Sequence, residues 1–188
     1  HDSDTHWLRA DVDCFLCREA RDVGVAVFKE CDVRQIDHVG SGDWRLEYER
    51  DGESIRLNAS FVIDATGEAG VLPRSLGIET STTGFQTNSR AIFSHFHKVR
   101  SWNELFVASG GTTAAHPFHC DHAAQHHLLD GAWLWMLRMN NDLTSVGLVL
   151  DSCKHPLNSE MSTETEWPNW LDRYPSVQEM LAKTEVAA

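Results

Sequence analysis

Apolar and charged side chains alternate most clearly over residues 44–49, with the period of two that is typical of a half-buried β-strand. The dipeptide Asp51-Gly52 follows, and it is a strong signal for a two-residue hairpin turn. The alternation resumes over residues 55–57. Val33 and the segment of residues 36–39 indicate one more strand before the alternation. The pattern therefore predicts a three-stranded antiparallel meander.

A second antiparallel sheet is predicted further along the chain, from strands at residues 91–99, 125–129, 133–139 and 143–150. Asp130-Gly131 is again a hairpin turn. Trp133 and Trp135 are two residues apart, so both indoles belong to one face of their strand. That face either packs on a hydrophobic core or lines a cavity for an aromatic ligand, and the sequence leaves both interpretations open.

Helical periodicity is found at both ends of the sequence. Residues 9–23 carry apolar side chains at helical spacing, and Gly24 after them is a typical C-terminal stop. Trp167-Pro168 predicts the start of a short helix with proline in its first turn. A last helix is expected over about residues 175–186.

Two uninterrupted apolar runs, at residues 25–28 and 61–63, are typical of strands that are covered on both faces. The second run leads directly into the turn Asp64-Ala65-Thr66-Gly67. Open α/β sheets bind ligands at the carboxyl ends of their strands, often beside such a glycine turn. Taken alone, however, the turn is more often a plain connection.

The order of elements predicts an α/β protein with a second, antiparallel sheet after the first. We expect a partial nucleotide-binding domain over residues 1–80, a β-sheet domain over residues 81–160 and a helical segment over residues 161–188. The composition becomes rich in Ser, Thr, Asn and His from residue 81, which marks the boundary. Because the sequence starts without Met and stops after a helix-like stretch, we expect it to be a piece of a longer chain.

Composition narrows the classes of function. The 188 residues carry a formal net charge of -12, which excludes a protein that reads nucleic acid through an overall cationic surface. No apolar run approaches the roughly 18 residues of a membrane span, so we expect a soluble, cytoplasmic protein. The five cysteines are too few and too scattered for a disulfide framework, and Cys14 and Cys17 lack a second pair that would complete a zinc site.

Histidines concentrate between residues 116 and 127, around Cys120 and Asp121. Adjacent pairs such as His119-Cys120 do not have the spacing of metal ligands on one helix face or hairpin. His122 and His126 would share a face only in a helix, whereas the following strand favours an extended backbone. We therefore expect no metal site here, and a His-rich metal-binding module remains an alternative.

Three motifs together resemble one family, the FAD-dependent monooxygenases of the flavin-dependent (tryptophan) halogenase branch. They are Arg9-Ala10-Asp11-Val12-Asp13 with Gly24, Val62-Ile63-Asp64-Ala65-Thr66-Gly67, and Trp133-Leu134-Trp135 with Ser145-Val146-Gly147. The resemblance covers most of the chain. Leu137-Arg138 stands where the halogenase motif has Ile-Pro, so hydroxylation, oxidation or reduction stays open beside halogenation.

The resemblance implies a partial Rossmann-like, glutathione-reductase-type FAD domain followed by an antiparallel β-sheet substrate domain. It implies FAD as the cofactor, an aromatic or electron-rich small molecule as the substrate, a reduced-flavin/O2 intermediate and a separate flavin reductase as a partner. The family's G-x-G-x-x-G unit has no counterpart in these residues. The cofactor contacts that it implies are Arg9, Val33, Asp64, Ala65, Thr66 and Gly67, and the substrate-facing residues are Trp133 and Trp135.

No catalytic residue is assigned, because none of the four lysines lies in the context of the family's catalytic lysine. A non-enzymatic β-rich binding domain is the other alternative.

Overall fold

The computed structural model describes residues 5–40, 42–67 and 70–187. The chain divides into two compact units. The small unit is Cys14–Phe85, and the large unit joins the residues up to Asp13 with those from Gln86 onward. Helix α1 (Arg9–Asp22) contributes to both units, and it ends where predicted, with the Gly24 N–H bonded to the Arg21 carbonyl at 2.9 Å.

A three-stranded antiparallel sheet forms the small unit, in the order β1 (Asp32–Val39), β2 (Asp43–Arg50) and β3 (Glu53–Ala59). The predicted hairpin is confirmed, since Asp51 and Gly52 join β2 to β3 with φ angles of 53° and 80°. Two positive φ angles are what a type I′ turn requires. A short helix, α2 (Val71–Leu76), follows the sheet and lies against β1.

The prediction of two buried strands is wrong for this structure. Residues 25–28 and 61–63 form neither a helix nor a strand. Phe61 and Ile63 are 76% and 80% exposed, and Val25 and Phe28 are about half exposed. A strand requires a neighbour that pairs with its backbone, and no strand in the described part of the chain lies beside either run.

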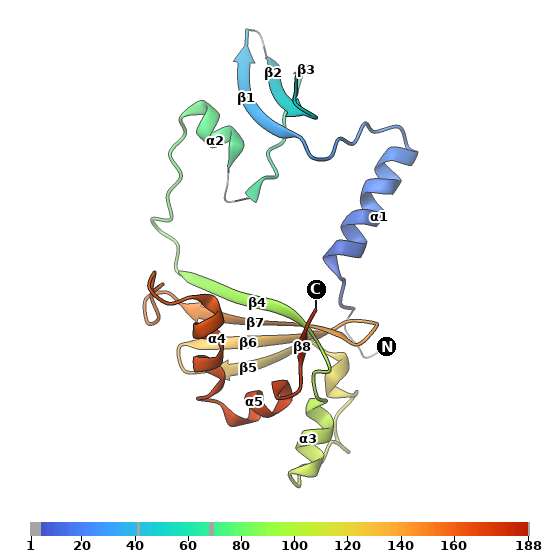
Figure 1. The fold of residues 1–188 in the computed structure, drawn as a ribbon, viewed down its shortest axis with the longest axis vertical. Helices are drawn as coiled ribbons and strands as arrows, with labels where there is room; N and C mark the ends of the chain where they lie inside the picture. Colours follow the sequence, from blue (N-terminus) through green and yellow to red (C-terminus); the bar gives the residue numbers. More distant parts are fainter. Residues whose placement is uncertain (1–4, 41, 68–69, 188) are drawn as a thin grey trace. The chain divides into compact units, whose positions relative to one another are not determined.

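The large unit is built on a five-stranded antiparallel sheet, in the order β5-β6-β7-β4-β8 (Figure 1). The strands are β5 (Gln125–Leu129), β6 (Ala132–Arg138), β7 (Leu143–Asp151), β4 (Ser89–His97) and β8 (Glu185–Val186). The predicted strands of this sheet are confirmed. β7 pairs with both β6 and β4 and is buried along most of its length.

One face of this sheet forms the hydrophobic core. Leu134 and Met136 of β6 lie opposite Leu148 and Val146 of β7, and each of the four is at most 1% exposed. Two helices, α4 (Thr163–Leu171) and α5 (Pro175–Leu181), complete the core with Trp170, Val177, Met180 and Leu181. The inner faces of α4 and α5 thus belong to the packed core of the large unit.

Both C-terminal helices differ from their predicted bounds. α4 begins at Thr163, so Pro168 is its sixth residue and lies outside its first turn. The amides of Thr165 and Glu166 both bond to the Ser162 carbonyl, which starts the helix earlier. α5 ends at Leu181 because the chain then turns and pairs with the edge of β4 as β8.

A helix that the sequence analysis missed, α3 (Trp102–Ala108), follows β4. The Ser101 hydroxyl accepts a hydrogen bond from the Glu104 amide, which is half of a capping box. A 3-10 turn, η2 (Cys120–His122), leads into β5. In the described residues, no helix is long and apolar enough to cross a membrane.

Candidate functional site

The turn after residues 61–63 is organised by the carboxylate of Asp64. One oxygen accepts hydrogen bonds from the Thr66 amide at 2.9 Å and from the Thr66 hydroxyl at 2.6 Å, and the other accepts from the Leu72 amide at 2.8 Å. The Thr66 hydroxyl oxygen in turn accepts from the Val71 amide at 3.1 Å. These bonds tie the turn to the start of α2.

The hydrogen bonds from Thr66 hold the pKa of Asp64 below its ordinary value. The side chains of Asp64 and Thr66 both therefore make hydrogen bonds within the turn. The turn also presents backbone, since Ala65, Thr66 and Gly67 are exposed. Gly67 has a φ of 66°, and among the described residues nothing beyond its chain neighbours lies within 4 Å of the position where a side chain would begin.

Val33, also predicted to contact the cofactor, lies on β1 next to a register irregularity between Val33 and Gln35. It is partly exposed, at 37%. Both Val33 and the Asp64 turn belong to the small unit, whereas Arg9, Trp133 and Trp135 belong to the large one.

The large unit contains an apolar groove of about 610 Å³ on the sheet face opposite the core. Phe93 of β4 and Trp135 of β6 form part of its wall, and their ring centroids are 6.1 Å apart. The chain just before α1 adds Trp7 and Leu8. The remaining lining residues are Arg9, Ala10, Asp13, Ala91, His95, Leu137, Met139 and Ser145.

Trp135 is held on the sheet by two residues of β7. Its indole nitrogen donates a hydrogen bond to the Ser145 hydroxyl at 3.2 Å. Its six-membered ring lies over Gly147, where an added Cβ would be 2.1 Å from the indole Cζ2. The Ser145-Val146-Gly147 segment therefore has a physical purpose, because it provides a hydrogen-bond acceptor and a flat seat for one indole.

The other predicted residues of this unit lie close to the groove or in it. Arg9 lines the groove and forms a two-point ion pair with Asp13 one helical turn later. Trp133 does not line it, but its ring is 5.9 Å from that of Trp135 and 5.0 Å from that of His126. The sequence analysis missed Trp7 and Phe93, which have no distinguishing motif.

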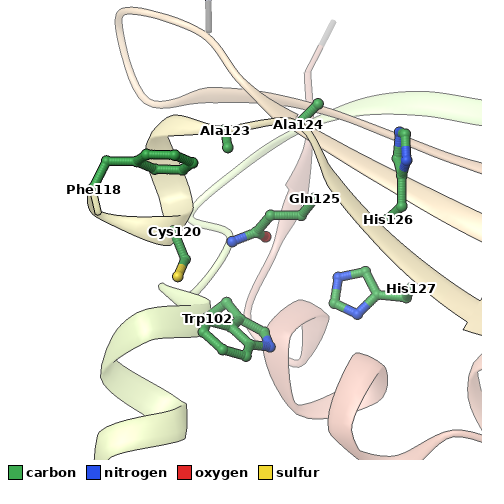
Figure 2. A pocket seen from close by; sticks show the side chains of 8 residues that line it. All are labelled: Trp102, Phe118, Cys120, Ala123, Ala124, Gln125, His126 and His127. Carbon is green, nitrogen blue, oxygen red and sulfur yellow. The ribbon is translucent and has the colours of Figure 1, made fainter. Parts of the chain in front are cut away.

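The histidine-rich segment surrounds a second, smaller pocket of about 300 Å³ (Figure 2). Its lining includes Trp102 from α3, Phe118, Cys120, and Gln125 and His127 from β5. Burial lowers the pKa of His127 from its usual value, with a contribution from His126. In the described ranges, no group of three or more His, Cys, Asp or Glu side chains is placed to hold a metal ion.

Asp121 organises this segment and is 4% exposed. Its carboxylate accepts hydrogen bonds from the Ser101 hydroxyl and from the Trp102 amide at the start of α3, and it lies 3.4 Å from Arg138. Burial opposes the charge, but the hydrogen bond from Ser101 and the charge of Arg138 outweigh it and lower the pKa of Asp121. Asp121 is thus a structural anion that joins α3, η2 and β6.

Comparison with known proteins gives this geometry a context. No family model matches the chain. Over 186 residues it is 26% identical to the monodechloroaminopyrrolnitrin halogenase PrnC of Pseudomonas fluorescens, an alignment that covers 93% of this chain and 30% of PrnC. It is also 26% identical to the tetracycline 7-halogenase of Kitasatospora aureofaciens, covering 94% of this chain and 32% of that enzyme.

Its relatives are flavin-dependent halogenases. Solved structures agree. CmlS, a flavin-dependent halogenase, is 28% identical with a TM-score of 0.71, over 95% of this chain and 30% of CmlS. A variant of the halogenase PltM solved in complex with FAD shares the fold, with a TM-score of 0.84 at 24% identity over 97% of this chain and 36% of that one.

The expected resemblance to this family and the expected fold class are confirmed. The chain spans about a third of the length of these curated halogenase relatives, at 30% and 32%. The metal-binding and non-enzymatic alternatives are not favoured.

Proposed function

We propose that this chain is the central part of a halogenase-like, FAD-dependent oxidoreductase that acts on an aromatic or electron-rich small molecule. The observation that carries the proposal is the apolar groove of the large unit, floored by a fixed indole, in a chain related to flavin-dependent halogenases. When bound, FAD supplies the redox chemistry with O2. The residues of this chain bind and orient the substrate, and they exclude water from it.

The turn at Asp64 fits one edge of such a cofactor. It exposes backbone at Ala65, Thr66 and Gly67 without bulky side chains, and Gly67 leaves room for close approach. The Asp64 carboxylate fixes this backbone through its bonds to Thr66 and Leu72. In this proposal Asp64 therefore acts through the geometry of the turn, while Val33 of the same unit makes a peripheral contact.

The groove is proposed to bind the aromatic substrate. Trp135, Phe93 and Trp7 offer flat apolar surfaces, which favour aromatic rings through offset stacking. His95 and Ser145 line the same groove and add a titratable nitrogen and a hydroxyl. Those two polar groups orient the substrate, while the aromatic walls exclude water from it.

The test uses the complete translation product that contains this sequence, purified and supplied with FAD, a flavin reductase with NADH, oxygen, and chloride or bromide. An electron-rich aromatic such as indole or a phenol serves as the substrate. We expect bound flavin in the visible spectrum and a product that gains a halogen or an oxygen by mass spectrometry. A preparation that neither binds flavin nor modifies any aromatic compound would contradict the proposal.

A separate flavin reductase and a cytoplasmic location form part of the proposal. The location is supported by the five cysteines, all of which are free thiols. For the 188-residue chain alone we expect weak FAD binding or none. A tight, stoichiometric yellow complex of this chain would contradict the expectation that these residues form only part of the cofactor site.

A further inference from the structure

Cys120 and His116 form a nucleophile–base pair at the second pocket. The Sγ atom of Cys120 is 3.0 Å from Nδ1 of His116, four residues earlier in the chain. With the imidazole proton on Nε2, Nδ1 is free to accept the thiol hydrogen. A thiol with a base in hydrogen-bond reach is the arrangement that activates cysteine nucleophiles.

His116 is in turn positioned by aromatic stacking. Its ring lies 6.4 Å from the ring of Phe106 at an interplanar angle of 15°, and Phe106 stacks on Trp102 at 4.8 Å. Phe106 and Trp102 both belong to α3, so a regular element orients the base. The thiol and its base are therefore held by the fold, although their loop carries neither helix nor strand before Cys120.

The neighbouring titratable groups make other contacts. His119 lies 4.9 Å from His122, ring to ring, and 3.7 Å from the carboxylate of Asp121. His126 packs on Trp133, and burial lowers the pKa of His127. His116 is the imidazole that contacts the thiol.

Cys120 opens into a pocket that accommodates a small ligand. In Figure 2 its sulfur points toward the side where Trp102 lies, and the Phe118 ring forms another wall. Gln125 and His127 also line the pocket, and the Gln125 Oε1 and His127 Nε2 atoms are buried without a hydrogen-bond partner. A pocket with aromatic walls, unsatisfied polar atoms and a nucleophile is suited to a ligand that is flat, partly polar and electrophilic.

This pocket is separate from the groove proposed for the substrate. Gln125 and His127 are paired with Met136 and Leu134 of β6, which face the core, whereas Trp135 faces the groove. The two sites therefore lie on opposite faces of one sheet, and the inference does not rest on the proposed function.

We propose that Cys120 is a nucleophilic thiol site for soft electrophiles that carry an aromatic ring, with His116 as its base. With a haloacetamide, the sulfur forms a bond to the carbon, the carbon–halogen bond breaks, and the halide leaves. The thiol proton passes to Nδ1 of His116. With a maleimide, the sulfur adds to one alkene carbon and the other carbon receives the proton, so no oxidant or reductant is needed.

The first test is iodoacetamide alkylation of the intact 188-residue chain, with the rate at each cysteine measured by peptide mass spectrometry. Cys153 is an exposed thiol in the same unit and serves as the internal reference. We expect alkylation at about pH 7.5 to be about tenfold faster at Cys120 than at Cys153, because only Cys120 has an imidazole within hydrogen-bond reach of its thiol. Equal rates at the two cysteines would overturn the proposal.

The His116→Gln variant separates base catalysis from simple exposure. We expect it to lower the Cys120 rate to that of Cys153 while the Cys153 rate itself stays unchanged. The matched control is His119→Gln, which replaces another exposed histidine, one that contacts Asp121 and His122. If His119→Gln has the same effect as His116→Gln, the proposed pair is wrong.

The aromatic preference is tested with N-phenylmaleimide and N-ethylmaleimide. The phenyl-to-ethyl rate ratio at Cys153 corrects for the different intrinsic reactivities of the two reagents. We expect the corrected preference of Cys120 for the phenyl reagent to be severalfold, and Phe118→Ala to reduce it. A corrected ratio of one would show that the pocket does not select aromatic electrophiles and would overturn that part of the proposal.

Discussion

Replacing Gly147 by alanine tests the seat of the Trp135 indole. The new Cβ would lie 2.1, 2.2 and 2.4 Å from three atoms of the indole, and real Cβ atoms essentially never come this close to other atoms. An indole is a rigid bicyclic ring and has no flexible end that could rotate away from the new Cβ, so the whole ring must move. Its hydrogen bond to Ser145 is then lost as well.

The magnitude follows from these two losses. Overpacking costs about 1–3 kcal/mol, and the hydrogen bond contributes about 1 kcal/mol. Alanine recovers about 0.5–1 kcal/mol of the entropic cost of glycine in a strand. We therefore expect Gly147→Ala to lower the free energy of unfolding of the large unit by about 1–3 kcal/mol, which shifts the urea midpoint by about 1 M.

Tryptophan fluorescence is a suitable readout of this change, since Trp44 is the only one of the seven tryptophans that belongs to the small unit. The control is a double-mutant cycle with Trp135→Ala, which removes the ring that Gly147 accommodates. We expect Gly147→Ala to cost less than about 0.5 kcal/mol in that background. A loss of equal size in both backgrounds would refute the reasoning, because the cost would then not come from the indole.

Three further predictions concern charged groups. Asp64→Asn should speed hydrogen exchange at the backbone amides of its turn. Because the pKa of Asp64 is lowered in the folded state, the stability that its carboxylate gives the turn is present above about pH 4 and is lost as the pH falls through that lowered pKa. Hydrogen exchange measured at several acidic pH values would detect this loss. Asp121→Asn should destabilise the large unit by about 2 kcal/mol, because it removes the charge that faces Arg138. The pKa of Asp121 is also lowered in the folded state, so the wild-type protein should lose stability below about pH 4 and the variant should lose less of it, as measured by fluorescence. Arg90→Gln should cost about 3 kcal/mol in urea unfolding, because Glu166 of α4 is 13% exposed and would lose its two-point partner on β4; a change below about 0.5 kcal/mol would show that the pair is solvated.

Local patterns in the sequence predicted most of both sheets. The Asp51-Gly52 turn and the alternation over residues 44–49 depend only on neighbours along the chain, and the structure has the expected hairpin there. Residues 61–63 behave differently, because an apolar run becomes a strand only beside a partner strand, and a sequence window does not contain that partner. The same limit explains why the last predicted helix ended early, at an edge of β4.

The groove could be predicted only in part. Trp135 was identified from its spacing to Trp133, but the choice between a core face and a cavity face depends on what the opposite face buries. Phe93 and Trp7 come from distant segments, and no local motif distinguishes them from ordinary apolar residues. The Ser101 and Glu104 capping box, in contrast, was readable and would have located α3.

The two faces of β6 explain why the groove exists at all. Successive side chains of a strand point to opposite faces, so Leu134 and Met136 cannot share a side with Trp133 and Trp135. The leucine and methionine face is sealed by α4 and α5 and is at most 1% exposed, whereas both indoles remain half-buried. The largest aromatic surface of this strand is thus kept out of the core, and only Gly147 lets the sheet hold an indole flat there. Trp135 therefore lies on the groove face, where the ligand proposed for the groove would cover more of its ring.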